Sequence, residues 1–312
     1  MKSTSVIKLA KYGAFSLAVS SDYKCLAVGA GSKVQILSLP EATVLHTLPI
    51  CNASSMVFLD NCESLLVVTT TGGIFLWKSE KLHRLGQWPA SLWRESPIFG
   101  CGQNYVALAH DEGVCLFDLQ SRQFKDVYLC PGRSAEIAAY KNGKLHMITY
   151  AFTKDWQKIQ RVAIDLQGNT YDIVEADCKL DVSNISRPVL LENNTIAFFA
   201  VFRRHIFTPD KSICTIDCNG HVVKSQSVPA NYPITGCAAI SVSKRYIAYA
   251  HMVSPHGVTM YAQDDLSLMG QITSGELWQE KNISPPSSLL FLSDAQLLIG
   301  TWDALFLYQI KQ

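Results

Sequence analysis

The stretch Tyr105–Leu119, with the sequence YVALAHDEGVCLFDL, predicts the fold of this chain. An apolar run (Tyr105–His110) meets the polar turn Asp111-Glu112-Gly113, and a second apolar run (Val114–Leu119) follows. Both runs are too short for helices, and they are rich in Val, Leu and aromatic residues, as strands are. An acidic turn that ends in Gly between two such runs indicates a tight antiparallel hairpin.

Imperfect copies of this unit account for nearly all of the chain. Their third strands begin near residues 33, 74, 114, 158, 211, 257 and 304, a period of roughly 40 to 50 residues that is typical of four-stranded propeller blades. We therefore expect an all-β fold, a seven-bladed β-propeller of four-stranded antiparallel blades that forms a single domain over residues 1–312. The expected blades are residues 14–49, 54–89, 96–130, 134–176, 187–228, 236–273, and 287–310 with 3–10.

The two ends of the chain predict how the ring closes. The seventh copy stops one strand short, after Leu305–Ile310, while the chain begins with a lone apolar strand, Thr4–Leu9. Each explains the other if the N-terminal strand completes the last blade, a closure that also removes exposed strand edges. A two-sheet sandwich would explain neither feature.

Bulk composition limits the classes of partner. Lys plus Arg (27) nearly equal Asp plus Glu (26), so we expect no nucleic-acid partner and no attraction to anionic membranes. No apolar run reaches the roughly 18 residues of a membrane-spanning helix. Ala14–Ser20 resembles a short signal-peptide core, but cleavage after it would delete strands that the repeat needs. We therefore expect a soluble cytoplasmic protein.

The 10 cysteines are scattered along the chain, and many lie inside apolar runs, as buried free thiols do. A chain of this length needs no disulfide framework for stability, so we expect free thiols. Cys214 and Cys218 come nearest to a metal pair, but four residues of a strand span about 13 Å, too far for one zinc ion to bridge. We expect no metal and no cofactor.

Two of the third strands carry a family resemblance. Gly73–Lys78 (GIFLWK) and Gly113–Asp118 (GVCLFD) each have a turn Gly, alternating aliphatic residues, and an aromatic residue before a polar one. In this they resemble the third strand of WD-repeat proteins, with weaker echoes at Val34–Ser38, Val258–Ala262 and Leu305–Gln309. The chain lacks the Gly-His pair that usually precedes the family's first strand, and its Trp302-Asp303 pair follows a second strand instead. A diverged WD-repeat-like propeller implies a platform for protein and peptide partners that seldom catalyses reactions.

Catalytic chemistry has little support in the residues. No P-loop, GxGxxG, GxSxG or HExxH motif occurs. Among the expected innermost strands only Glu136 is ionisable, and one carboxylate supplies neither an acid–base pair nor a cation cage. We interpret Glu136 as a hydrogen-bonded rim residue, assign no catalytic residue, and regard an enzyme as the less favoured class.

The loops predict where a partner binds. Loops that join second to third strands, and loops that join successive blades, share one face of a four-stranded-blade ring, here called the loop-rich face. The long ones are residues 89–96, 153–157, 176–187, 203–210, 251–257 and 273–286. They are rich in the residue types that dominate interface energetics. The predicted partner-binding residues are Trp93, Arg94, Lys154, Asp155, Trp156, Arg203, Arg204, His205, Tyr232, His256, Trp278 and Trp302.

These residues leave alternatives open. Each Trp can instead plug its own loop, and Arg203-Arg204-His205 fits either an anion site or a solvated loop tip. We expect a non-catalytic protein- or peptide-binding scaffold that uses the loop-rich face over blades four to seven, as a monomer or as a subunit of a hetero-complex. One alternative is a small-molecule hydrolase or lyase with His205, His256 and Asp155 as acid–base groups. Another is a structural subunit of a larger complex.

Overall fold

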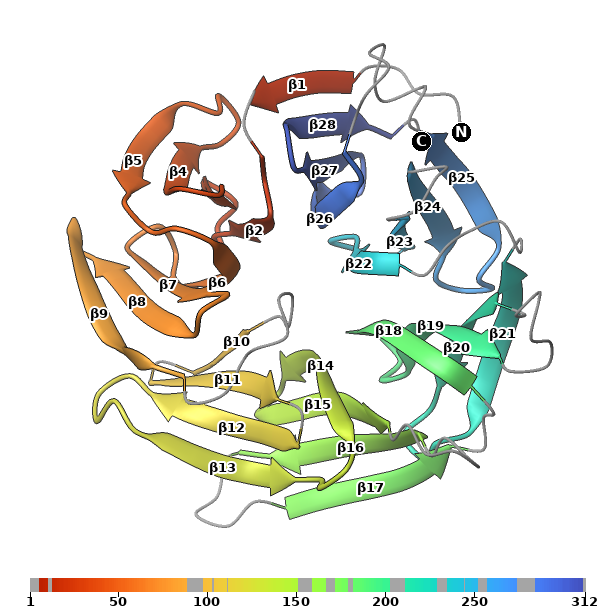
Figure 1. The fold of residues 1–312 in the computed structure, drawn as a ribbon. Helices are drawn as coiled ribbons and strands as arrows, with labels where there is room; N and C mark the ends of the chain where they lie inside the picture. Colours follow the sequence, from red (N-terminus) through yellow and green to blue (C-terminus); the bar gives the residue numbers. More distant parts are fainter. Residues whose placement is uncertain are drawn as a thin grey trace.

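The fold is a closed ring of seven antiparallel sheets with four strands each (Figure 1). The computed structural model describes residues 6–10, 13–88, 98–102, 104–110, 112–150, 159–166, 172–178, 182–202, 211–228, 235–243, 245–251, 257–273 and 284–310. Within these ranges every regular element is a strand, and no helix is present that could span a membrane. The predicted all-β, seven-bladed propeller is therefore confirmed.

The strands follow the blades in chain order, apart from the last blade. Blades one to three contain β2 (Ser16–Val19), β3 (Cys25–Gly29), β4 (Val34–Ser38), β5 (Val44–Leu48), β6 (Ala53–Asp60), β7 (Ser64–Thr69), β8 (Gly73–Lys78), β9 (Lys81–Gln87), β10 (Phe99–Cys101), β11 (Tyr105–His110), β12 (Gly113–Asp118) and β13 (Phe124–Leu129). Blades four and five contain β14 (Ser134–Lys141), β15 (Lys144–Tyr150), β16 (Ile159–Asp165), β17 (Asp172–Cys178), β18 (Val182–Leu190), β19 (Ile196–Phe202), β20 (Lys211–Ile216) and β21 (Val222–Val228). Blade six contains β22 (Thr235–Ile240), β23 (Tyr246–His251), β24 (Gly257–Ala262) and β25 (Leu268–Thr273), and blade seven β26 (Pro286–Ser293), β27 (Gln296–Thr301) and β28 (Leu305–Gln309) with β1 (Val6–Ala10).

The ring closes through the N-terminal strand, as the sequence predicts. The last sheet has the order β1-β28-β27-β26, and Val6 of β1 lies opposite Tyr308 of β28. In Figure 1, β1 lies beside β28 of the last blade, and the chain then continues into blade one, so the first and last blades meet at this crossing. This crossing is tight: the Ala14 N–H donates to Thr301 O at 2.7 Å, and a Cβ on Gly13 would lie 2.1 Å from Trp302 O. The position therefore requires glycine.

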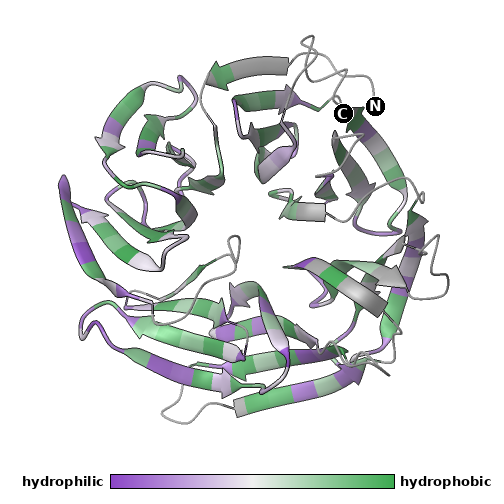
Figure 2. Cartoon of the chain, in the orientation of Figure 1, coloured by the Kyte–Doolittle hydropathy of each residue, from purple (hydrophilic) through white to green (hydrophobic). Residues whose placement is uncertain are grey.

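The core lies between neighbouring blades. One cluster packs Leu66 and Val68 of blade two against Val106 and Phe117 of blade three, all at most 1% exposed. Each blade thus buries both faces of its inner strands, while the outermost strand meets water. In Figure 2, β9 carries long hydrophilic stretches whereas β12 is mostly hydrophobic. Because every blade shares its core with two neighbours, the inner strands form a rigid frame.

Two expectations are wrong. Residues 176–187 are not a long connection, because β17 extends to Cys178 and β18 already begins at Val182. The polar composition of that stretch suggested a loop, but pairing with the apolar β19 makes it a strand. A disulfide joins Cys25 to Cys62, whereas the other 8 cysteines are free, as expected. Blade packing brings the bonded pair together from 37 residues apart.

Candidate functional site

A cavity of about 150 Å³ opens at the centre of the ring, between the innermost strands of blades one, two, five, six and seven. Its apolar wall includes Phe15, Leu17, Met56 and Leu289, and Arg187 is the one charged side chain among the described residues that line it. Phe15 and Leu289 lie near the starts of β2 and β26, where connections from the preceding blades arrive. The cavity therefore belongs to the loop-rich face.

Serine hydroxyls at the same level join the blades to one another. Ser16 Oγ donates to Ala53 O at 2.9 Å, which links blade one to blade two. Ser288 Oγ donates to Ala14 O at 2.8 Å, which links blade seven to blade one. Ser55 Oγ accepts a hydrogen bond from the Ile98 N–H, just before blade three, at 3.0 Å. These hydroxyls join neighbouring blades around the cavity, so their role is structural.

Arg187 reaches the cavity because β18 is irregular there. The register between β18 and β19 shifts between Ser186 and Val189, and Arg187 itself has a φ of 46°. Bulges of this kind re-aim side chains, and strained backbone tends to occur at functional positions. The expectation that Glu136 is the only ionisable residue of the innermost strands is wrong, since the longer strands also include Asp60, Lys141 and Arg187.

The Glu136 carboxylate accepts hydrogen bonds from two neighbouring blades. Its Oε1 accepts from the Tyr150 hydroxyl at 3.0 Å, and its Oε2 accepts from the Arg187 N–H at 3.1 Å. The carboxylate thus connects the second strand of blade four to the bulge of blade five. The prediction of a hydrogen-bonded residue is confirmed, and the bond also helps to fix the bulge that carries Arg187.

An exposed aromatic pair adjoins the cavity. Trp302 lies in the turn between β27 and β28 and is 55% exposed, and Phe15 is 38% exposed. Their ring centroids are 6.5 Å apart at an interplanar angle of 44°, within the range of favourable aromatic contacts. Trp302 does not plug its own loop; it stands in solvent beside the aromatic wall of the cavity.

Trp302 is the one predicted partner-binding residue that the structure describes. The other eleven lie outside the described residues: Trp93, Arg94, Lys154, Asp155, Trp156, Arg203, Arg204, His205, Tyr232, His256 and Trp278. Sequence reasoning missed Phe15 and Arg187. Phe15 looked like an ordinary first-strand core residue, and its position directly after a blade connection was the available signal. For Arg187 the signal was weak, because the bulge depends on pairing with β19.

A buried histidine with a lowered pKa lies away from the cavity. His146, on β15, is 8% exposed, and its pKa falls to about 4 because burial, and then the charge of Arg161, disfavour the imidazolium. Arg161, on β16, is buried as well and donates from Nη1 to Ile216 O of blade five at 3.3 Å. The hydrogen bond from Arg161 holds blades four and five together.

No cluster of three or more metal-ligating side chains occurs among the described residues.

Comparison with known proteins identifies the architecture. No protein-family model matches the sequence, and no curated protein does. The structure is similar to the β-propeller domain of Cps50 (Swd1) from Myceliophteria thermophila, with a TM-score of 0.70 and 11% identity over 98% of this chain and 100% of that one. In all, 1067 solved chains match in structure, and a fold shared so widely does not specify a function.

Proposed function

We propose that this propeller is a non-catalytic scaffold that binds a protein or peptide on its loop-rich face. The binding surface covers blades four to seven and the mouth of the central cavity, here called the channel entrance. The observation that carries the proposal is the exposed pair Phe15 and Trp302 beside the cavity that Arg187 lines. Aromatic residues and Arg dominate the energetics of protein interfaces. A rigid closed ring presents such residues at little entropic cost.

The size of the cavity favours a peptide over a free small molecule. Sites for drug-sized ligands usually span about 300 to 1,000 Å³, whereas this cavity holds about 150 Å³. A space of that size accepts one apolar side chain. The rest of the partner would then lie across the aromatic pair and the surrounding loops, where most predicted contact residues occur.

Two alternative functions can be tested separately. A structural subunit of a larger complex predicts a native mass far above 34.5 kDa. A hydrolase or lyase would use His205, His256 and Asp155, and turnover in a broad hydrolase screen would favour it. A cytoplasmic location stays a proposal as well, and the Cys25–Cys62 disulfide would be unusual in a permanently reducing compartment.

A peptide-display selection on the immobilised propeller tests the scaffold function. We expect Phe15→Ala and Trp302→Ala each to raise the Kd of selected peptides by roughly tenfold or more, as hot-spot residues do. Tyr105→Ala is the matched control, since Tyr105 is 44% exposed and starts β11, on the opposite face. Equal losses for all three variants, or peptides that bind the double variant Phe15→Ala/Trp302→Ala as tightly, would rule out the channel entrance. The triple variant Trp156→Ala/Arg203→Ala/Trp278→Ala tests the loops. We expect it to abolish binding of the selected peptides and to keep the wild-type Tm.

A further inference from the structure

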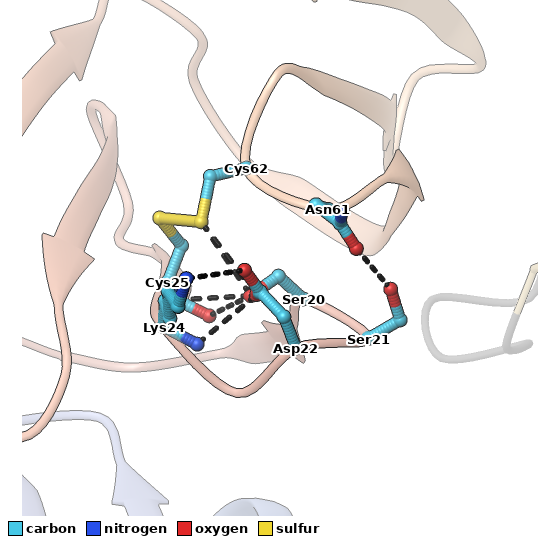
Figure 3. A network of polar contacts seen from close by, with 7 residues as sticks. All are labelled: Ser20, Ser21, Asp22, Lys24, Cys25, Asn61 and Cys62. Carbon is cyan, nitrogen blue, oxygen red and sulfur yellow. Dashed lines mark hydrogen bonds and ion pairs between the residues drawn. A yellow bond between two sulfur atoms is a disulfide. The ribbon is translucent and has the colours of Figure 1, made fainter.

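A disulfide crosses the seam between blades one and two (Figure 3). It lies where second strands begin, which is the face opposite the channel entrance. Cys25 is the first residue of β3, and Cys62 lies in the turn between β6 and β7. Their Cα atoms are 5.7 Å apart, and the sulfur atoms are bonded. Beside the bond, the Ser21 hydroxyl donates to Asn61 Oδ1 at 2.7 Å, also from blade one to blade two.

The same seam is held at its other end by the Ser16 hydroxyl, which donates to Ala53 O. Strands β2 and β6 run between these two ends, and both contribute residues to the cavity. One end is thus fixed by a hydrogen bond, and the other by a bond that depends on redox conditions. A chemical change at Cys25–Cys62 alters how firmly two adjacent blades are joined.

The two sulfur atoms differ in access. Cys25 is 4% exposed and packs in the core between the blades. Cys62 is half-buried, in a turn whose neighbours Asn61 and Glu63 are exposed. A thiolate from solution can therefore approach Cys62 Sγ, whereas Cys25 Sγ is shielded. Exchange depends strongly on which sulfur can be attacked.

A carboxylate faces the accessible sulfur. Asp22 Oδ1 lies 3.9 Å from Cys62 Sγ, and Ser20 Oγ lies 3.6 Å from it. The Ser20 hydroxyl donates to Asp22 Oδ1 at 2.6 Å and, as the largest cause, lowers the pKa of that carboxyl below its ordinary 3.8. Asp22 is therefore negative at neutral pH, and Lys24 Nζ, 3.8 Å from its Oδ2, is the nearby positive charge.

We propose that Cys25–Cys62 is a thiol–disulfide switch that sets the strength of the seam between blades one and two, with Cys62 as the sulfur that exchanges and Asp22 as a guard against anionic thiols. A small-molecule thiolate attacks Cys62 Sγ, the S–S bond breaks, and Cys25 leaves as a thiolate that takes a proton from the solution. A second thiolate then attacks the mixed disulfide and releases Cys62. The net change reduces one protein disulfide to two thiols and oxidises two small thiols to one disulfide; a small-molecule disulfide such as oxidised glutathione reverses it.

The rate of exchange tests the roles of the charges. Purified protein is treated at low salt with 2-mercaptoethanol or 2-mercaptoethanesulfonate, whose thiolates carry one and two negative charges. We expect Asp22→Asn to accelerate exchange by roughly threefold to tenfold with 2-mercaptoethanesulfonate, and by less with 2-mercaptoethanol. Added salt should reduce the rate difference between wild type and variant. Lys24→Gln should shift the rate with the sulfonate in the opposite direction. Equal rates for wild type and both variants would remove Asp22 as a guard.

Peptide mapping and melting curves test the switch itself. Non-reducing mass spectrometry should find Cys25 linked to Cys62 after oxidised glutathione, and the first mixed disulfide on Cys62. Reduction, or Cys62→Ser, should lower Tm by about 5 °C, as expected for a loop of 37 residues in a chain of this size. Cys218→Ser, at an exposed free cysteine, should leave Tm unchanged. Two free thiols after oxidation, a mixed disulfide on Cys25, or an unchanged Tm on reduction of the wild-type chain would each overturn the proposal, whatever the channel entrance binds.

Discussion

Mild acid should lower the free energy of unfolding of this propeller through His146, at pH values above those that protonate its ordinary Asp carboxyls. Its pKa lies at about 4 in the folded chain, against an ordinary 6.5, so folding keeps the imidazole neutral. Its Nδ1 is buried without a hydrogen-bond partner among the described residues, and the nearby Arg161 charge repels a second cation. Since the folded pKa is depressed, the unfolded chain binds more protons between these values, and stability falls as the pH drops from 6.5 toward 4.

The size of the effect follows from the two pKa values. The full difference corresponds to about 3 kcal/mol, and at pH 5, relative to pH 7.5, the loss is about 2 kcal/mol, because the unfolded histidine is then almost fully protonated. The Asp carboxyls with lowered pKa values, such as Asp22 and Asp118, stay ionised in this window, since their ordinary value is 3.8. The window from pH 7.5 to 5 thus separates the contribution of His146 from that of these carboxyls.

Urea unfolding followed by Trp fluorescence measures the loss. We expect the unfolding free energy of the wild type to fall by about 2 kcal/mol more between pH 7.5 and 5 than that of His146→Leu. His83→Leu, at an exposed position of β9, serves as the control and should keep the wild-type pH dependence. A His146→Leu variant as acid-sensitive as the wild type, or an NMR titration of His146 near pH 6.5, would refute the reasoning.

Three further changes probe the ring. Tyr249→Phe should raise the unfolding free energy by about 1 kcal/mol, because the hydroxyl is fully buried without a partner among the described residues; a loss in urea unfolding would reveal a bond to it. Gly300→Ala should cost about 2 kcal/mol in the same assay, because a Cβ there would lie 2.2 Å from Ser288 Oγ and 2.3 Å from Ala14 O, and no change would mean that the strands can separate. Removal of residues 1–10 should expose the edge of β28 and cause aggregation, measured by light scattering; a monomer with wild-type Tm would contradict closure through β1.

Some features of the candidate site depend on strand pairing that no local pattern reports. The repeat indicated that Trp302 follows a second strand, and it does, but its contact with Phe15 requires the first and last blades to meet. Arg187 enters the cavity through a shift in register between β18 and β19. The loop lengths could not report this bulge, because residues 176–187 read as a polar connection.

The amino-acid sequence by itself determined the blades and the closure. Alternating apolar runs, short turns and the lone strand at Thr4–Leu9 are local signals, and one period repeated along the chain permits one architecture. Only the tertiary structure decided which side chains of different blades meet: Cys25 with Cys62, Arg161 with Ile216 O, and Phe15 with Trp302. The physical reason is that such contacts depend on the register and stagger of neighbouring sheets, which the whole ring sets as it closes.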